Sequence, residues 1–222
     1  MTETETHAGN LKLIGGWLCL NFINTVDWRT SDHPHEWLTK YADFVSWSRH
    51  ASILADSEAR SLLRKAELHP KEANAILERA IILRETLYRI FSAIIGHSLP
   101  SRSDIIALNT ELSKARARMW LAPTADGRSW TYAFEDNALD RPLWSVAHSA
   151  ADLLVSDKIS RISRCSTQEC GWLFLDLSRN RSRKWCDMED CGNRAKARRH
   201  YRRKRAYVDS SSLRKDTTQF ST

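Results

Sequence analysis

The stretch CSTQECGWLFLDLSRNRSRKWCDMEDCG, residues 165–192, holds four of the five cysteines of the 222-residue chain. They fall into two pairs, Cys165 with Cys170 and Cys186 with Cys191, with four residues inside each pair and fifteen between the pairs. Thiolates bind zinc as a tetrahedron, and two short-spaced pairs joined by a loop supply it without a large scaffold. We therefore predict that these four cysteines hold one structural Zn²⁺ ion.

Zinc is favoured over disulfides for this cluster. The chain starts MTETETHAGN, which is acidic and polar, unlike a signal peptide, and no segment approaches the ~18 consecutive apolar residues of a membrane span. We therefore expect a cytoplasmic protein without a membrane segment, in which thiols stay reduced. Four protein ligands leave no coordination position for water, so the ion is expected to be structural. The fifth cysteine, Cys19, lies in an apolar run, and we expect it to be buried.

The segments around the cysteines predict a small zinc-binding fold. Gly171 and Gly192 follow the second cysteine of each pair, where glycine lets the backbone turn tightly toward the thiolates. Residues 173–177 and 182–185 read as the arms of a hairpin, and residues 193–205 have good helix composition without an apolar face. The order of knuckle, hairpin, second cysteine pair and helix is typical of a treble-clef finger.

Three acids, Asp187, Glu189 and Asp190, precede this predicted helix. Negative charge is favoured at a helix N-terminus, where Asp190 would be the capping residue. A solvated acidic loop is the alternative interpretation.

Positive charge is concentrated in the same region. The whole chain has a formal net charge of +7, whereas residues 161–205 contain fourteen Lys or Arg and five Asp or Glu, a net charge of +9. The rest of the chain is therefore slightly acidic, with a net charge of −2. Such a local concentration of positive charge indicates a surface that binds a polyanion, and not charge that only keeps the protein soluble.

Upstream of the cysteines, the apolar period predicts a mainly helical structure. Helices are expected over residues 36–54, 57–68, 70–97, 104–116 and within 139–156, and a hairpin is expected around Asp126-Gly127. Residues 11–28 predict a strand or a buried strand-to-helix corner. The fold class is therefore mainly α with a small β-hairpin in an N-terminal domain, residues 1–157, then a treble-clef-like zinc finger of β-hairpin plus basic helix, residues 158–207, and a disordered tail, residues 208–222.

Enzymatic chemistry has little support in this sequence. HPHE, residues 33–36, lacks the helical spacing of a metalloprotease motif and reads as a loop and helix start. No Gly-rich phosphate loop or nucleophile elbow is present, so we expect no enzyme. Asn24 and Thr25 are polar residues inside an apolar run, which indicates either satisfied core groups or the edge of a ligand pocket.

Residues 165–205 closely resemble the CGNR zinc finger, named for the tetrapeptide that here is Cys191-Gly192-Asn193-Arg194. The resemblance includes FLDLSRNRSRKWC before the second cysteine pair. Near the start, LCLNFINTVDW resembles the ABATE domain, which commonly precedes this finger in bacterial proteins described as stress-induced transcription regulators. The resemblance implies that the four cysteines are the zinc ligands and that the flanking basic residues bind DNA.

The candidate DNA-binding residues lie on the predicted hairpin and helix: Arg181, Arg183, Lys184, Asn193, Arg194, Lys196, Arg198, Arg199, Arg202 and Arg203. Phosphate contacts position a protein, whereas base readout needs a few side chains aimed at groove edges. Asn193, Arg194 and Arg198 are the best-placed candidates for readout. Asn193 has the alternative of satisfying backbone groups beside the metal.

Two classes of function follow from these patterns. The first is a zinc-dependent regulator that binds double-stranded DNA and whose N-terminal domain senses a small-molecule effector or forms a homodimer. The second is a zinc-stabilised adaptor whose basic helix docks on RNA or on an acidic protein.

Overall fold

The computed structural model describes residues 5–134 and 138–216. Helices and turns are η1 Ala8–Asn10, α1 Leu18–Ile23, α2 Tyr41–His50, α3 Asp56–Leu68, α4 Pro70–Ile95, α5 Arg102–Ala117, α6 Arg141–Val155, η2 Asp157–Arg161, η3 Met188–Gly192 and α7 Asn193–Asp216. Strands are β1 Val26–Asp27, β2 His35–Glu36, β3 Met119–Pro123, β4 Trp130–Phe134, β5 Ile162–Arg164 and β6 Leu173–Leu175. They form three antiparallel two-stranded ribbons, β1 with β2, β3 with β4 and β5 with β6. The predicted mainly α fold class is confirmed.

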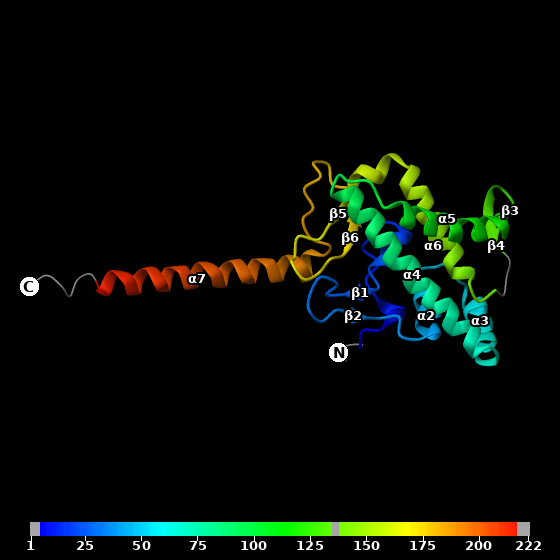
Figure 1. Ribbon diagram of the computed structural model, residues 1–222, viewed down its shortest axis with the longest axis horizontal. Helices are drawn as coiled ribbons and strands as arrows, with labels where there is room; N and C mark the ends of the chain where they lie inside the picture. The colour runs from blue at the N-terminus through cyan, green and yellow to red at the C-terminus, as the bar shows by residue number, and fades with distance from the viewer. Residues whose placement is uncertain (1–4, 135–137, 217–222) are drawn as a thin grey trace, which may run out of the picture.

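The helical body is built around α4, which crosses it and packs against α1, α2, α3, α5 and α6 (Figure 1). Proline opens α4 at its first position, where no backbone N–H is needed. One side of this helix is apolar, and there Ala80, Leu87, Ile90 and Phe91 are fully inaccessible. Among the described residues, no helix is long and apolar enough to cross a bilayer.

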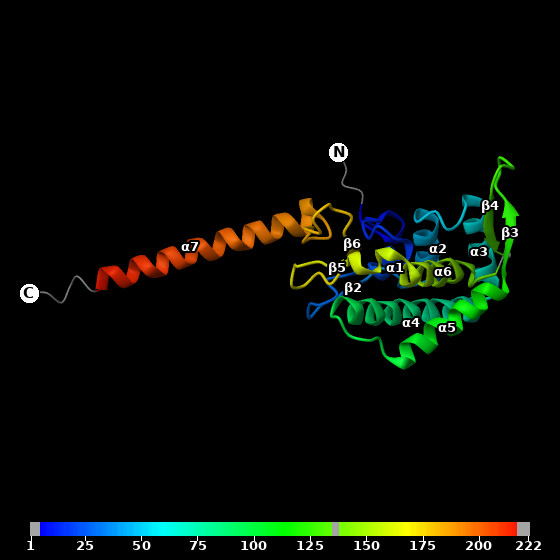
Figure 2. The same ribbon diagram turned by 90° about the horizontal axis from the view of Figure 1, so that it is seen from above.

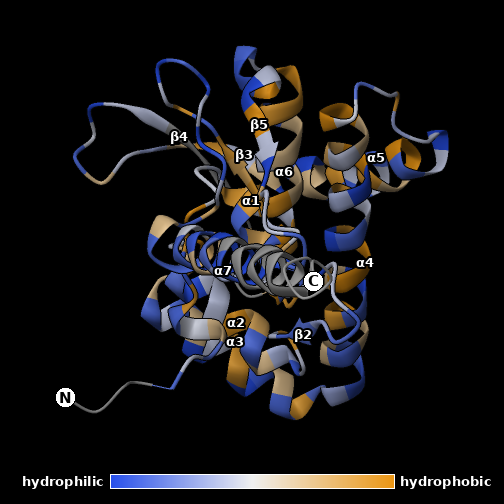
Figure 3. Ribbon diagram, turned by 90° about the vertical axis from the view of Figure 1, so that its left-hand side faces the viewer, coloured by the Kyte–Doolittle hydropathy of each residue, from blue (hydrophilic) through white to orange (hydrophobic). Residues whose placement is uncertain are grey.

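Two elements project from opposite ends of this body. The β3–β4 hairpin, with Pro123 opposite Trp130, lies at one end, and α7 extends from the other (Figure 2). In a view along α7, the coloured part of the helix is mainly hydrophilic (Figure 3). The structure continues α7 to Asp216, past residue 207 where we predict that the tail begins, and residues 217–222 lie outside the described part.

The segment between α1 and α2 differs from the prediction. A helix was expected from Glu36, but residues 35–36 pair with β1 and α2 begins at Tyr41. The Glu36 carboxylate explains the later start, because it accepts a hydrogen bond from the Leu38 amide at 2.8 Å and binds Arg84 at 2.6 Å. These contacts hold residues 35–38 extended before the helix starts.

The short strand β6 joins two cores. Because successive strand residues point to opposite faces, Leu173 and Leu175 enter the core formed by the helices, while Phe174 packs with the four cysteines and Trp172. All three strand residues are at most 2% exposed. The helical core therefore continues past residue 157, where we predict the domain boundary.

The predicted partner of β6 is wrong, because β6 pairs with β5, which precedes the first cysteine, and not with residues 182–185. The other edge of β6 is already occupied: Asn24 exchanges two hydrogen bonds with Leu173 at 2.8 and 2.9 Å, and the Leu175 amide donates to the Gly15 carbonyl at 2.8 Å. No edge is left for residues 182–185. The core interpretation of Asn24 is confirmed by the same contacts.

Asp104 provides a test of stability in the helical body. Hydrogen bonds from Arg89 and Ser101 lower the pKa of its carboxyl against the opposing effect of burial. A lowered pKa stabilises the fold above the unfolded value of about 3.9, and this stabilisation is lost as pH falls through the folded value. Asp104→Asn is expected to lower the free energy of unfolding by about 1–2 kcal/mol at pH 7, with a difference from wild type that shrinks below about pH 4. Denaturant titrations check this, with the exposed Asp32→Asn as control; a loss that is equal at pH 7 and pH 3 would contradict it.

Candidate metal centre and nucleic-acid interface

The four cysteines of the two pairs come together in space. Their sulfur atoms all lie within 4.8 Å of one another, with Cys170 Sγ 3.6 Å from Cys186 Sγ and Cys186 Sγ 3.5 Å from Cys191 Sγ. A zinc tetrahedron with ~2.3 Å bonds has sulfur atoms about 3.8 Å apart. Each cysteine is at most 6% exposed, so no solvent position competes for the ion. The donor set and its closed geometry fit one structural zinc ion.

The two cysteine pairs use their glycines differently. Gly171 has φ +71°, in the left-handed region expected for a tight turn, and a Cβ there would lie 3.0 Å from Arg29 Cβ. Gly192 is not in that region, which corrects the expectation of a second tight turn. Its lack of a side chain instead admits Met188, whose Sδ would lie 2.6 Å from a Cβ at this position.

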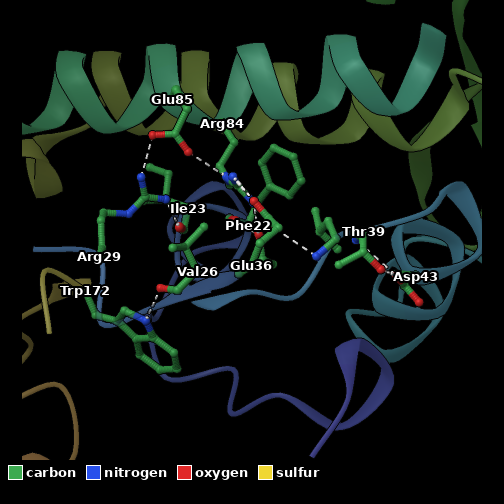
Figure 4. Close-up of polar contacts among 12 residues, drawn as sticks. Phe22, Ile23, Val26, Arg29, Glu36, Thr39, Asp43, Arg84, Glu85 and Trp172 are labelled. Atoms are coloured by element: carbon green, nitrogen blue, oxygen red, sulfur yellow. Dashed lines mark hydrogen bonds and ion pairs between the residues drawn. The ribbon is translucent and has the colours of Figure 1, made fainter. Parts of the chain in front are cut away.

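A loop of the helical body, residues 26–30, docks on the first cysteine pair. The Arg29 amide donates to the Cys170 carbonyl at 3.2 Å, and the Thr30 hydroxyl donates to the Gln168 carbonyl at 2.7 Å. From the other side, the Trp172 indole donates to the Val26 carbonyl at 2.8 Å (Figure 4). These bonds fix the metal centre to the body at the backbone level.

A partly buried charge network between α4 and this loop holds the loop in place. Arg29 pairs with Glu85, Glu85 contacts Arg84 at 2.9 Å, and Arg84 reaches Glu36 at 2.6 Å (Figure 4). This network was not predicted from the sequence pattern. The signal was present, since Arg84 occupies a position of the apolar stripe of α4 between Ala80 and Leu87, where a charged residue indicates a buried partner.

Arg194 connects the metal centre to the same loop. Its guanidinium lies 3.2 Å from Cys191 Sγ, 3.4 Å from an Asp190 carboxylate oxygen and 4.2 Å from the centre of the Trp28 ring. Donation to a metal-bound thiolate spreads the negative charge of the site. A guanidinium can make all three contacts at once because it is planar and carries several N–H groups.

The start of α7 is also tied to the second cysteine pair. Asp187, and not Asp190 as predicted, is the capping residue here, at the start of η3, the turn that leads into α7: its carboxylate accepts from the Glu189 amide at 3.0 Å and pairs with Lys12. Asp190 is instead engaged with Arg194. The Asn193 side chain donates to the Glu189 carbonyl at 2.8 Å, which agrees with its alternative role beside the metal.

Family comparisons match both halves of this arrangement. Residues 16–157 match the ABATE family, described as "putative stress-induced transcription regulator". The chain belongs to the ABATE family. Residues 161–204 match the CGNR zinc finger, so the clustered cysteines form its single zinc site. Neither is an enzyme family, and a comparison with curated proteins found no match.

The basic residues of the CGNR finger fall into two groups. Arg183, like Arg194, is folded inward: it lies 4.2 Å from the centre of the Phe174 ring and donates to the Trp185 carbonyl at 3.1 Å. The exposed candidates are Arg181, Lys184, Asn193, Lys196, Arg198, Arg199 and Arg202, while Arg203 is placed only as part of the α7 backbone. Arg198 pairs with Glu169 at 2.7 Å. The exposed group extends from the loop after β6 along α7.

Arg194 gives a prediction for the zinc centre of this ABATE protein. Arg194→Lys keeps the charge but cannot reproduce the planar contact with Cys191 and Trp28. We expect the zinc affinity of this variant, measured by competition with a chelator, to be about 10–100-fold lower. This is the usual effect of losing a group that supports a metal ligand. Arg199→Lys, on the exposed side of the same helix, is the control, and equal zinc affinity in the two variants would contradict the assignment.

Proposed function

We propose that this protein is a transcription regulator that binds double-stranded DNA through its CGNR finger, with α7 as the main contact element. The observation that carries the proposal is that α7 is basic and exposed and begins directly after the second cysteine pair of the zinc site. Between Asn193 and Arg205, α7 has eight Lys or Arg and no acidic residue. An α-helix fits the major groove of B-DNA, which is about 12 Å wide.

The charge of α7 supports a polyanion as its partner. Like charges one turn apart on a helix repel each other, and α7 has no apolar face with which to pack on the protein. A row of phosphates removes this repulsion and releases counterions, which is the main source of affinity in such interfaces. Lys196, Arg199 and Arg202 are exposed and are proposed as phosphate contacts, together with Arg181 and Lys184 at the base of the helix.

The two readout candidates that are already engaged within the finger, Asn193 and Arg194, are proposed to position α7 and not to read bases. Arg194 is engaged by Cys191 and Trp28, and Asn193 by the Glu189 carbonyl. Among the three readout candidates, this leaves Arg198, whose pairing with Glu169 is solvent-exposed and exchangeable. The ABATE domain is proposed to hold the finger and to sense a small-molecule effector or form the homodimer.

The deciding experiment is selection from a random duplex-DNA pool by the zinc-loaded full-length protein at near-physiological salt, with a chelator-treated control. The proposal expects an enriched motif that is lost on chelation, and a palindromic motif would indicate the homodimer. Retention without a motif, falling steeply with added salt, would contradict specific recognition and favour the RNA or acidic-protein alternative.

A further inference from the structure

A cavity of about 400 Å³ lies between the ABATE domain and the zinc centre. Its apolar lining comes from Leu11 and Ile14 and from the indoles of Trp28 and Trp172. Pockets of this size enclose a small organic molecule, and those between structural units are common ligand sites. Both units line this cavity, so an occupant touches the ABATE loop and the finger together.

The polar groups in the cavity determine the charge of the ligand that it suits. Lys12 and Arg194 are the two cations in the lining, and each is already engaged, Lys12 by Asp187 and Arg194 by Asp190 and Cys191. A zinc ion held by four thiolates adds a net charge of about −2 beside the cavity. The lining therefore has an excess of negative charge.

Asp27 is the acid in the lining for which the described residues provide no direct ion pair. One carboxylate oxygen accepts a hydrogen bond from the Trp37 indole at 3.0 Å, and among residues 5–134 and 138–216 no ion-pair partner of Asp27 lies within 4 Å. Burial raises the pKa of this carboxyl more than the Trp37 bond and the more distant charges of His35 and Arg194 lower it. A cation beside it would offset the cost of keeping the carboxylate charged in a partly buried place.

Trp28, next in sequence, is held in an unfavourable conformation. Its φ of +54° lies in the left-handed region, which is costly for a bulky side chain. The surrounding bonds of Arg29 with Glu85 and Cys170 hold it there. The Trp28 indole therefore lies at the cavity directly after Asp27, and it already holds a cation, since the Arg194 guanidinium is 4.2 Å from the centre of its ring.

We propose that this cavity binds a small organic cation, an amine or guanidinium compound whose charged group lies at the Asp27 carboxylate and whose apolar body packs on the walls formed by Leu11, Ile14 and Trp172. This inference rests on the effector-sensing role proposed for the ABATE domain, for which it names the site and the ligand class. It does not depend on DNA binding.

The test uses three probes of similar shape on the zinc-loaded full-length protein without DNA: 2-phenylethylamine, the neutral 2-phenylethanol and the anionic 3-phenylpropionate. Titration calorimetry is expected to give a Kd for the amine below about 1 mM, at least about tenfold weaker binding of the alcohol and no detectable binding of the carboxylate. An amine that binds no better than the alcohol, or preferred binding of the anion, would overturn the proposal whatever the outcome of the DNA selection.

Variants locate the binding to Asp27. Asp27→Asn keeps an oxygen that accepts the Trp37 hydrogen bond but removes the charge, so it is expected to weaken amine binding at least about tenfold and leave alcohol binding unchanged. Asp157→Asn, at an exposed acid outside the cavity lining, should bind the amine as wild type does. Full amine affinity in Asp27→Asn would overturn the assignment, and zinc content is measured in each variant to verify that the finger is intact.

Discussion

Cys170→Ser is expected to lower the zinc content from one ion per chain to a trace amount after dialysis against a weak chelator. Serine supplies no thiolate, and the three remaining cysteines cannot close a tetrahedron around the ion. Structural zinc contributes an apparent ~10–16 kcal/mol to the folding of isolated fingers, so residues 165–192 are expected to lose their fixed structure. Metal analysis and hydrogen exchange measure the two effects.

The same variant tests how the CGNR finger is joined to the ABATE domain. Because Leu173 and Leu175 belong to the helical core, loss of the finger is expected to lower the melting temperature of the remaining helices by several degrees without unfolding them at 25 °C. Cys19→Ala is the matched control: Cys19 is fully buried outside the cluster, and zinc content should stay at one ion. Stoichiometric zinc in Cys170→Ser would refute the ligand set.

The second large effect is expected on DNA affinity. Replacing Lys196, Arg199 and Arg202 together by glutamine removes three exposed charges from α7 without touching the zinc centre. If each contacts a phosphate, the slope of log K against log salt should become smaller by about 2.7, and affinity near 100 mM salt should fall roughly 100-fold or more. Fluorescence anisotropy with a labelled duplex over a range of salt concentrations measures both quantities.

A control variant with the same change in net charge distinguishes direct phosphate contacts by α7 from general attraction between DNA and a positively charged protein. Arg60, Arg64 and Lys71 are exposed on α3 and the first turn of α4, away from the finger, and their triple glutamine variant should change the slope little. Equal losses in the two triple variants would mean that net charge alone governs binding, which would remove α7 as the contact element.

Features that depend on neighbours in the sequence were predicted well. The cysteine spacing indicated the zinc site, the apolar stripe from Pro70 indicated α4, and Asp126-Gly127 indicated the β3–β4 hairpin. Each of these depends on interactions within one helix, one turn or one short loop, where spacing along the chain largely fixes geometry.

The partners of buried polar groups were not predictable in this way. Strand β6 has one edge bound by Asn24 and Gly15, about 150 residues earlier in the chain, and Arg84 is buried because Glu36 and Glu85 surround it. The sequence shows that buried polar and charged groups need hydrogen-bonding or ion-pair partners, but it does not show which residues those partners are. Similarly, the run of basic residues did not reveal that Arg183 and Arg194 face inward.

The sequence by itself determined the zinc ligands, the mainly helical class and the location of the basic segment, because covalent spacing and periodicity act over a few residues. Only the tertiary structure decided which strand β6 joins and which arginines face inward or outward. It also decided that Asp27 and Trp28 line a cavity beside the zinc site. These outcomes depend on burying charged and polar groups against partners distant in the chain, and the free energy of such contacts is set by the assembled fold.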